Sequence, residues 1–259
     1  MKPMCRLLGI YGEVNGWSEV ALEFRKLAED GMVPPICAEP GHRDGWGMAA
    51  ANDDRTSMRV VERRMGSANE SALYENTVHG FGAQPYIFIC HIRKASPGIP
   101  VTISNVHPFA NGGWAFVHNG TIYDYARLPV DPAFHLTSDG SDSECFFSYL
   151  MGKIKTAASG SDRVKLLGEA MASLDIDYTS LNCILSNGSE LYAIRDYMKF
   201  GEYLSLFYYP LPKGVVVCSE PLAVDGLQKS RWQAVPNQSI LRVHGAPPVC
   251  ELSGYRSTA

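Results

Sequence analysis

Short apolar runs dominate the hydrophobic pattern of this chain, and most are bounded by Gly, Asn or Pro. Runs of this kind are typical of β-strands. They predict strands at residues 6–11, 46–51, 58–62, 86–92, 114–117, 181–185, 191–195, 204–208, 215–218 and 240–243. Between two of them, Asn187-Gly188 predicts a type I′ hairpin turn, because both residues tolerate the positive φ angles that this turn needs.

Apolar residues at helical spacing occur in four places, residues 18–28, 71–79, 141–154 and 162–174. The first is the clearest, since Val20, Phe24 and Leu27 fall on one helical face. Ser141 and Glu144 have the spacing of a capping box at the start of the third helix. Because the helices stand between groups of strands and do not alternate strictly with them, the pattern favours an α+β fold over a doubly wound sheet.

The composition excludes several classes of protein. The 259 residues are 46% apolar and 19% charged, which is ordinary for a globular protein. A net charge of −4 without a Lys/Arg run gives no electrostatic basis for binding nucleic acid. No apolar stretch is long enough to span a membrane and no secretory signal follows the start, so we expect a cytoplasmic protein with no membrane partner.

Seven cysteines, an odd number and widely scattered, indicate reduced thiols and not a disulfide framework. No Cys-x-x-Cys or His-x-x-x-His pair occurs, so we predict no metal site, and no motif calls for another cofactor. No shift in composition marks a domain boundary. We therefore expect one domain over residues 5–255, preceded by a short extension at residues 1–4.

Polar clusters interrupt the strand pattern, and two long loops, residues 30–43 and 125–140, lead into two of them. Loops of this length are often functional. The clusters are GHRDGWG at residues 41–47, HIRKAS at 91–96, NVHPF at 105–109 with FVHNGTI at 116–122, and SDSE at 141–144.

Each cluster has an ordinary structural explanation: Arg93 as a surface residue, Asn119-Gly120 as a tight turn, and Asp142 as a favourable charge in a first helical turn. Together they match the needs of a nucleophile at Cys5, which follows Met4. Removing that methionine would leave a thiol beside a free α-amine that can serve as its base. An asparagine amide and a glycine N–H can bind an oxyanion. Arg93 and Asp142 suit the carboxylate and ammonium of an amino-acid head group.

The ordered set of motifs resembles the class II glutamine amidotransferases of the N-terminal-nucleophile hydrolase superfamily, in particular a stand-alone branch that includes γ-glutamyl amidohydrolases. The resemblance extends over nearly the whole chain, from Cys5 to Glu144 and on to segments near Ser180, Ser219 and Trp232. It implies a four-layer sandwich, with helices outside and two mostly antiparallel sheets within.

The resemblance also implies roles for single residues. Cys5 would be the nucleophile, with its own α-amine as base and acid. Asn119 and the N–H of Gly120 would form the oxyanion hole. Arg93 would bind the α-carboxylate and Asp142 the α-ammonium of a glutamine or γ-glutamyl group. Ser96 would assist the arginine, and the segment with Asp44 and Gly45 would line the pocket. His91 and His118 are interpreted as scaffold for Arg93 and Asn119.

Two departures from the family pattern stand out. Relatives carry the cysteine directly after the initiator methionine, whereas here residues 1–4 precede Cys5. Either translation starts at Met4 or the tetrapeptide is a propeptide; if it persists, the Cys5 nitrogen is an amide without basicity. The second departure is Pro97, which replaces a small or polar residue beside the loop of Arg93.

Several functions stay open at this stage. The substrate could be glutamine or a γ-glutamyl conjugate, and released ammonia could pass to a partner protein or be lost. One rival function is a cysteine peptidase that pairs Cys5 with His118 or His91, although peptidase cysteines usually begin a helix. The other rival is a catalytically silent member of the fold, blocked by residues 1–4, that acts as a binding or assembly subunit.

Overall fold

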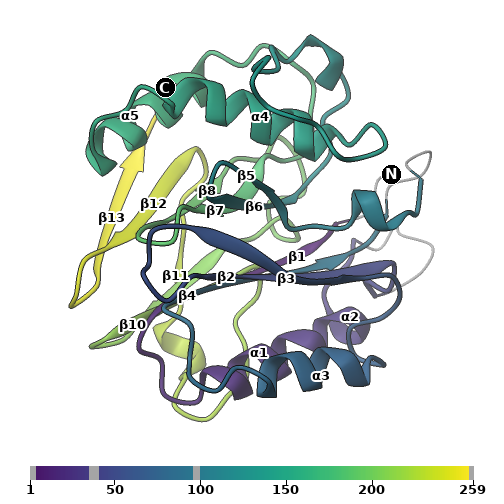
Figure 1. Ribbon diagram of the computed structural model, residues 1–259, viewed down its shortest axis with the longest axis vertical. Helices are drawn as coiled ribbons and strands as arrows, with labels where there is room; N and C mark the ends of the chain where they lie inside the picture. Colours follow the sequence, from purple (N-terminus) through teal and green to yellow (C-terminus); the bar gives the residue numbers. More distant parts are fainter. Residues whose placement is uncertain (1–3, 35–40, 96–99, 257–259) are drawn as a thin grey trace.

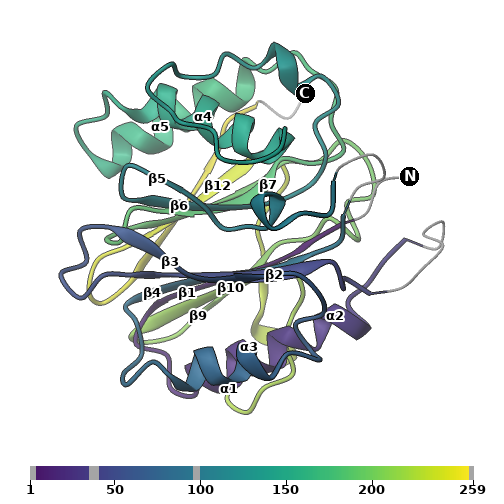
Figure 2. The same ribbon diagram turned by 45° about the vertical axis from the view of Figure 1, so that its right-hand side comes forward.

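Two β-sheets stack face to face, and helices cover both outer faces (Figure 1). The computed structural model describes residues 4–34, 41–95 and 100–256. The expected α+β class and the order of four layers, helices, sheet, sheet and helices, are confirmed, and the same order is visible in a second view (Figure 2). All pairs between the named strands are antiparallel.

The first sheet has seven strands in the order β11-β9-β10-β1-β4-β2-β3. Its central strand β1 begins one residue after Cys5 and is paired on both sides, with β10 and β4. The strands span Arg6–Gly12 (β1), Gly45–Ala51 (β2), Met58–Arg64 (β3), Ile87–Arg93 (β4), Phe207–Pro210 (β9), Gly214–Cys218 (β10) and Gln233–Ala234 (β11).

The second sheet has six strands in the order β13-β12-β8-β7-β6-β5. Strand β6 lies opposite β1 and β4 of the first sheet, which brings the ends of these three strands together. The strands span Phe109–Asn111 (β5), Trp114–Asn119 (β6), Asn182–Ser186 (β7), Leu191–Arg195 (β8), Ser239–His244 (β12) and Val249–Gly254 (β13).

Helices α1–α3 cover the outer face of the first sheet, and α4 and α5 cover that of the second (Figures 1 and 2). They span Trp17–Arg25 (α1), Leu27–Asp30 (α2), Ala72–His79 (α3), Asp142–Ile154 (α4) and Gly160–Ala172 (α5). Three short 3-10 turns complete the described chain, Ile103–Asn105 (η1), Tyr125–Arg127 (η2) and Lys229–Arg231 (η3).

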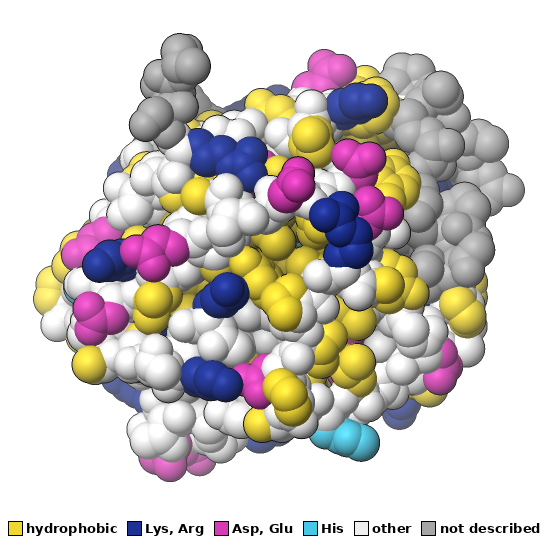
Figure 3. Space-filling model, turned by 90° about the horizontal axis from the view of Figure 1, so that it is seen from above, with side chains coloured by type: hydrophobic (Ala, Val, Ile, Leu, Met, Phe, Trp, Pro, Cys, Tyr) yellow, Lys and Arg dark blue, Asp and Glu magenta, His cyan; other side chains and the backbone are white. Residues whose placement is uncertain are grey.

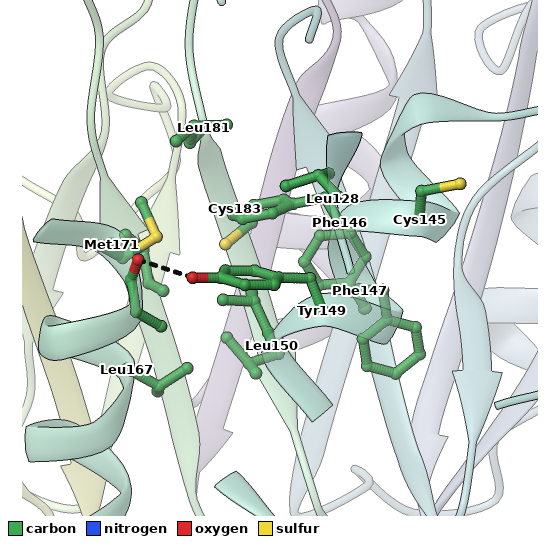
Figure 4. Close-up of a cluster of buried hydrophobic side chains, with 14 of the residues drawn as sticks. Leu128, Cys145, Phe146, Phe147, Tyr149, Leu150, Leu167, Met171, Leu181 and Cys183 are labelled. Atoms are coloured by element: carbon green, nitrogen blue, oxygen red, sulfur yellow. Dashed lines mark hydrogen bonds between the residues drawn. The ribbon is translucent and has the colours of Figure 1, made fainter. Parts of the chain in front are cut away.

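Alternation along the strands explains the layers, because successive side chains of a strand point to opposite faces. In β1, Leu8 and Ile10 belong to the core beneath the helices, whereas Leu7 and Tyr11 belong to the core between the sheets. A third core lies between the second sheet and helices α4 and α5 (Figure 4). There the Tyr149 hydroxyl donates a hydrogen bond of 2.9 Å to the Ala170 carbonyl and ties the two helices together.

The surface over the second helical layer carries basic and acidic side chains of both signs around apolar ones (Figure 3). No single-sign field is present on this face, in agreement with the small net charge. Among the described residues, none of the helices combines the length and apolarity needed to cross a lipid bilayer. Within the same residues, no group of His, Cys, Asp and Glu side chains is arranged to hold a metal ion.

The strand and helix predictions are confirmed with small shifts in their bounds, except at a few places. The run at 204–208 becomes a strand only from Phe207, because the N–H of Leu204 is used in a turn with the Phe200 carbonyl. The first helix divides at Lys26 into α1 and α2. Three strands were not predicted: β5 and β11 are very short, and β13 is a largely exposed edge strand without the expected apolar run.

Two predictions about local structure are wrong. The hairpin at Asn187-Gly188 exists, but its loop has four residues and only Gly188 has a positive φ, +93°. The turn is not type I′, because the Asn187 side chain accepts the N–H groups of Ser189 and Glu190 and closes a wider loop.

The capping box at the start of α4 does not form either. Ser141 is the N-cap residue, but its side chain caps nothing. The Glu144 carboxylate instead accepts the backbone N–H groups of Thr137 and Ser138, at 2.9 and 2.7 Å. The loop before the helix folds back over the first turn, so its donors reach Glu144 in place of the N-cap N–H.

Candidate active site

A small cavity opens where β1 and helix α4 begin and where β4 and β6 end. Three of its walls come from different layers of the fold, so only tertiary packing assembles it. Four of the candidate site residues from the sequence, Cys5, Arg93, Gly120 and Asp142, line the cavity. It is lined by Cys5, Arg93, Lys94, Asn105, His107, His118, Gly120, Ser141, Asp142 and Ser143.

Cys5 enters the site from the end of β1 and is only partly buried. Its backbone nitrogen donates to Asn119 Oδ1 at 2.7 Å, and its thiol lies 3.6 Å from the Lys94 carbonyl oxygen. Burial raises the pKa of the thiol to about 11 despite the nearby charge of Arg93. At neutral pH the sulfur is therefore protonated and needs a base to become a nucleophile.

Asn119 ends β6, and its side chain is fully buried beside Cys5. Since Oδ1 accepts the Cys5 N–H, Nδ2 must point elsewhere, and it has no hydrogen-bond partner among the described residues. Gly120 follows at the cavity wall, where an added Cβ would lie 1.9 Å from the Ser180 carbonyl oxygen. The chain needs glycine here because its backbone passes this close to Ser180.

Arg93 ends β4 with a side chain that is 4% exposed. Its Nη2 donates to the Pro100 carbonyl at 3.1 Å, while Nη1 is buried without a partner among the described residues. Asp142, the first residue of α4, occupies another wall. Its carboxylate accepts the N–H of Ile122 at 2.8 Å and the N–H of Ser143 at 2.8 Å. A guanidinium and a carboxylate thus border the same cavity.

The remaining predicted binding residues are Asp44, Gly45 and Ser96. Asp44 and Gly45 are not among the lining residues of the described cavity. Asp44 accepts the N–H of Ala95 at 2.6 Å, and its own N–H donates to the Arg93 carbonyl, so it braces the chain on both sides of Lys94. Gly45 pairs with Arg93 across the sheet. Ser96 lies outside the described residues.

His91 and His118, both buried, have contacts that fit the expected scaffold role. His91 donates from Nε2 to the His118 carbonyl at 3.1 Å and so links the end of β4 to the end of β6. His118 donates from Nε2 to the Ser180 carbonyl at 3.1 Å, and its Nδ1 lies 2.9 Å from Ser143 Oγ. Burial lowers the pKa of His91 to about 3 and also lowers that of His118. Both rings are neutral at pH 7.

These hydrogen bonds argue against a peptidase-type pair of Cys5 with His118 or His91. Both ring nitrogens of His118 already have partners other than Cys5, and Nε2 of His91 is bonded to a carbonyl oxygen. In addition, Cys5 leads into the strand β1, whereas the cysteine of such a peptidase usually begins a helix.

Sequence reasoning gave no role to Arg6, which directly follows the nucleophile. It is fully buried, and it donates to the Cys5 carbonyl at 2.9 Å. Its Nε forms an ion pair of 2.5 Å with Glu220, which also accepts the N–H of Met32. A charged residue inside an apolar strand run was the available signal, because a buried arginine requires a partner.

Comparisons with known proteins bear on this geometry. Residues 4–209 match the family model of glutamine amidotransferases class-II. An uncharacterized protein of Methanocaldococcus jannaschii is 33% identical over 75% of this chain, which spans about half of that relative. A γ-glutamyl-hercynylcysteine sulfoxide hydrolase of Mycobacterium tuberculosis is 28% identical over 93% of both chains.

Solved structures share the fold at low sequence identity. A glutamine aminotransferase class-II domain protein from Silicibacter pomeroyi superposes with a TM-score of 0.61 at 19% identity, over 96% of this chain and 100% of that one. The allosteric regulatory enzyme of purine biosynthesis gives a TM-score of 0.65 at 17% identity, over 98% of this chain and 50% of that one.

Proposed function

The chain belongs to the class II glutamine amidotransferases, and we propose that it hydrolyses the γ-amide of glutamine or a γ-glutamyl compound through a thioester on Cys5. One observation carries the proposal. The Cys5 nitrogen lies 2.7 Å from Asn119 Oδ1, while Asn119 Nδ2 is buried without a partner among the described residues. A nucleophile, its neighbouring nitrogen and a free oxyanion donor are therefore held together.

The first step needs a base for the thiol. When Cys5 is the first residue, its α-amine has an unperturbed pKa of ~7.7 to 8.0 and can take the thiol proton near neutral pH. The thiolate then attacks the γ-carbonyl carbon, and the carbonyl electron pair moves to oxygen. Asn119 Nδ2 and the Gly120 N–H stabilise this oxyanion. The bond from Cys5 to Asn119 Oδ1 holds the amine beside the sulfur.

The intermediate then collapses. The carbonyl re-forms, the carbon–nitrogen bond breaks, and the α-ammonium gives its proton to the leaving nitrogen, which departs as ammonia or an amine. Water attacks the γ-glutamyl thioester with the α-amine again as base. Glutamate leaves, and the proton returns to the Cys5 sulfur, so no other co-reactant is required.

The amino-acid head group is assigned to two charges that border the cavity. Arg93 offers to the α-carboxylate its Nη1, which has no partner within the described part of the chain, and Asp142 offers its carboxylate to the α-ammonium. Ser96 is proposed to assist Arg93. Asp44 and Gly45 are proposed to position other site residues. Asp44 holds the segment whose Lys94 carbonyl faces the thiol, and Gly45 pairs with Arg93.

The residues assigned above bind the γ-glutamyl head group and do not define the leaving group of the substrate. The name of the mycobacterial relatives supports a γ-glutamyl conjugate, because they match 93% of this chain and are called hydrolases of such a compound. Glutamine is the second substrate to test. For ammonia released from glutamine the proposal has two fates, transfer to an acceptor on a partner protein or loss to solvent.

The test uses two forms of the protein, one that starts at Met1 and one that starts at Met4. Each is incubated with glutamine and with several γ-glutamyl amides, and glutamate release is followed, while intact mass reports the N-terminus. We expect activity from the form with a mature Cys5 terminus, none from that form carrying Cys5→Ser, and a γ-glutamyl adduct on Cys5 after rapid quenching.

The alternative is a catalytically silent protein, and the burial of Met4 supports it. Its side chain is 3% exposed, so residue 4 is packed into the fold while attached to Cys5. If the protein from its native host retains Met4, and both forms are inactive on every compound with an unmodified Cys5, the silent function replaces the enzymatic one.

A further inference from the structure

His107 is a buried residue of the cavity wall whose polar atoms are unused. The residue is only 5% exposed, and neither Nδ1 nor Nε2 has a hydrogen-bond partner among the described residues. A buried imidazole without partners is unfavourable, because its N–H has lost water and gained nothing. The ring borders the same cavity as Cys5 and Arg93.

The surroundings hold this ring in one place. It packs against His91 with 4.2 Å between ring centroids and the ring planes tilted by 37°, and it lies edge-on to Phe109 at 4.6 Å. Its backbone presses against β2, where a Cβ added to Gly47 would lie 2.2 Å from the His107 carbonyl oxygen. The unpartnered nitrogens are therefore a fixed feature of the cavity and not the result of a freely rotating side chain.

His107 lies on the Arg93 side of the cavity. His91, against which it packs, and Arg93 are two residues apart in β4, so they project from the same face of the sheet. Two residues before His107, Asn105 donates to the Pro100 carbonyl at 3.1 Å, the same oxygen that accepts Arg93 Nη2. Residues 105–107 and the guanidinium thus form one wall.

Electrostatics keeps the ring neutral on that wall. Burial, reinforced by the neighbouring rings of His91 and His118 and by the charge of Arg93, lowers the pKa of His107 well below its usual range. A neutral imidazole has one N–H donor and one acceptor. Beside a guanidinium whose Nη1 is also unpartnered, the N–H is suited to a ligand that carries negative charge.

We propose that His107 is a substrate-binding residue whose ring N–H donates to the α-carboxylate of the γ-glutamyl group beside Arg93. This assignment rests on the proposed function and extends its binding site by one residue. The head group would then be held by a charge from Arg93 and by a neutral, rigid donor from His107. The neutral donor adds direction without another buried charge.

Two variants separate binding from packing. His107→Phe keeps a ring against His91 and Phe109 but has no nitrogen, whereas His107→Gln keeps a donor. Both are assayed on a γ-glutamyl amide and on the same amide without its α-carboxylate. We expect His107→Phe to raise KM about 10- to 100-fold for the complete substrate, as for a hydrogen bond to a charged group, with kcat little changed. The decarboxylated substrate should be nearly unaffected, and His107→Gln should recover part of the loss.

An equal loss on both substrates, or no loss on either, would overturn the assignment. The unaltered protein provides a second measurement: the ring-nitrogen chemical shifts of His107 should change on adding glutamate but not γ-aminobutyrate, which lacks the α-carboxylate. The same change with both ligands, or none with glutamate, would also count against the assignment. Failure of the proposed function looks different, because the unaltered Met4-start protein would then release no glutamate.

Discussion

Two buried asparagines stand opposite each other at the ends of β6 and β7, and they make a matched pair for testing the oxyanion hole. Asn119 and Asn182 are partners in the strand register and are both fully buried. Asn182 uses both ends of its amide, since Nδ2 donates to the Leu204 carbonyl at 2.9 Å and Oδ1 accepts the Asp196 N–H at 2.9 Å. Among the residues that the structure describes, Asn119 uses only Oδ1.

The two alanine variants should therefore differ in kind. Asn119→Ala removes a free donor and should lower kcat by about 10²- to 10³-fold, the usual effect of losing one oxyanion donor. Its cost in the free energy of unfolding should be about 1 kcal/mol, from the single bond to Cys5. Asn182→Ala leaves a buried carbonyl and a buried N–H unpaired, each worth about 1 to 3 kcal/mol, and should leave kcat much closer to that of the parent.

The assay is steady-state glutamate release by the Met4-start protein, with unfolding in urea measured on the same samples. The reasoning predicts a large loss of turnover at small loss of stability for Asn119→Ala, and the opposite for Asn182→Ala. Retention of most of kcat in Asn119→Ala would refute the oxyanion role. Equal losses of kcat in the two variants would show that any damage at this strand pair disturbs the site.

Two further predictions follow from buried ionisable groups at and beside the nucleophile. In the Met1-start protein, the pKa of about 11 keeps the Cys5 thiol protonated, so its alkylation by iodoacetamide should be slow at pH 8 and become faster as the pH approaches 11. Mass spectrometry measures the alkylation rate at each pH. An inflection of this rate below pH ~9 would contradict the prediction. Arg6→Met leaves Glu220 buried without its partner and should lower the free energy of unfolding by about 3 to 5 kcal/mol in urea titrations. Adding Glu220→Gln should restore part of this loss, and no recovery would mean that the ion pair is not its source.

Much of the fold was predictable because each layer corresponds to a local pattern of apolar residues in the sequence. Strands such as β1 and β7 are buried on both faces and read as short apolar runs, and α5 shows helical spacing. The edge strand β13 has no such mark, since its side chains are mostly exposed and only pairing with β12 makes it a strand. Layer order came from the family resemblance, because apolar periodicity does not say which face meets which.

For the site, the sequence by itself determined the chemistry on offer: a cysteine before a strand, an arginine and an Asn-Gly pair at strand ends, and an aspartate at a helix start. Tertiary structure alone decided which of these share a cavity. It placed Cys5, Arg93, Gly120 and Asp142 together and put Asp44 outside the cavity, where it supports the Lys94 segment. It also left the nitrogens of His107 without a partner among the described residues. The physical reason is that hydrogen-bond partners and burial depend on contacts between strands far apart in the chain, which no local pattern encodes.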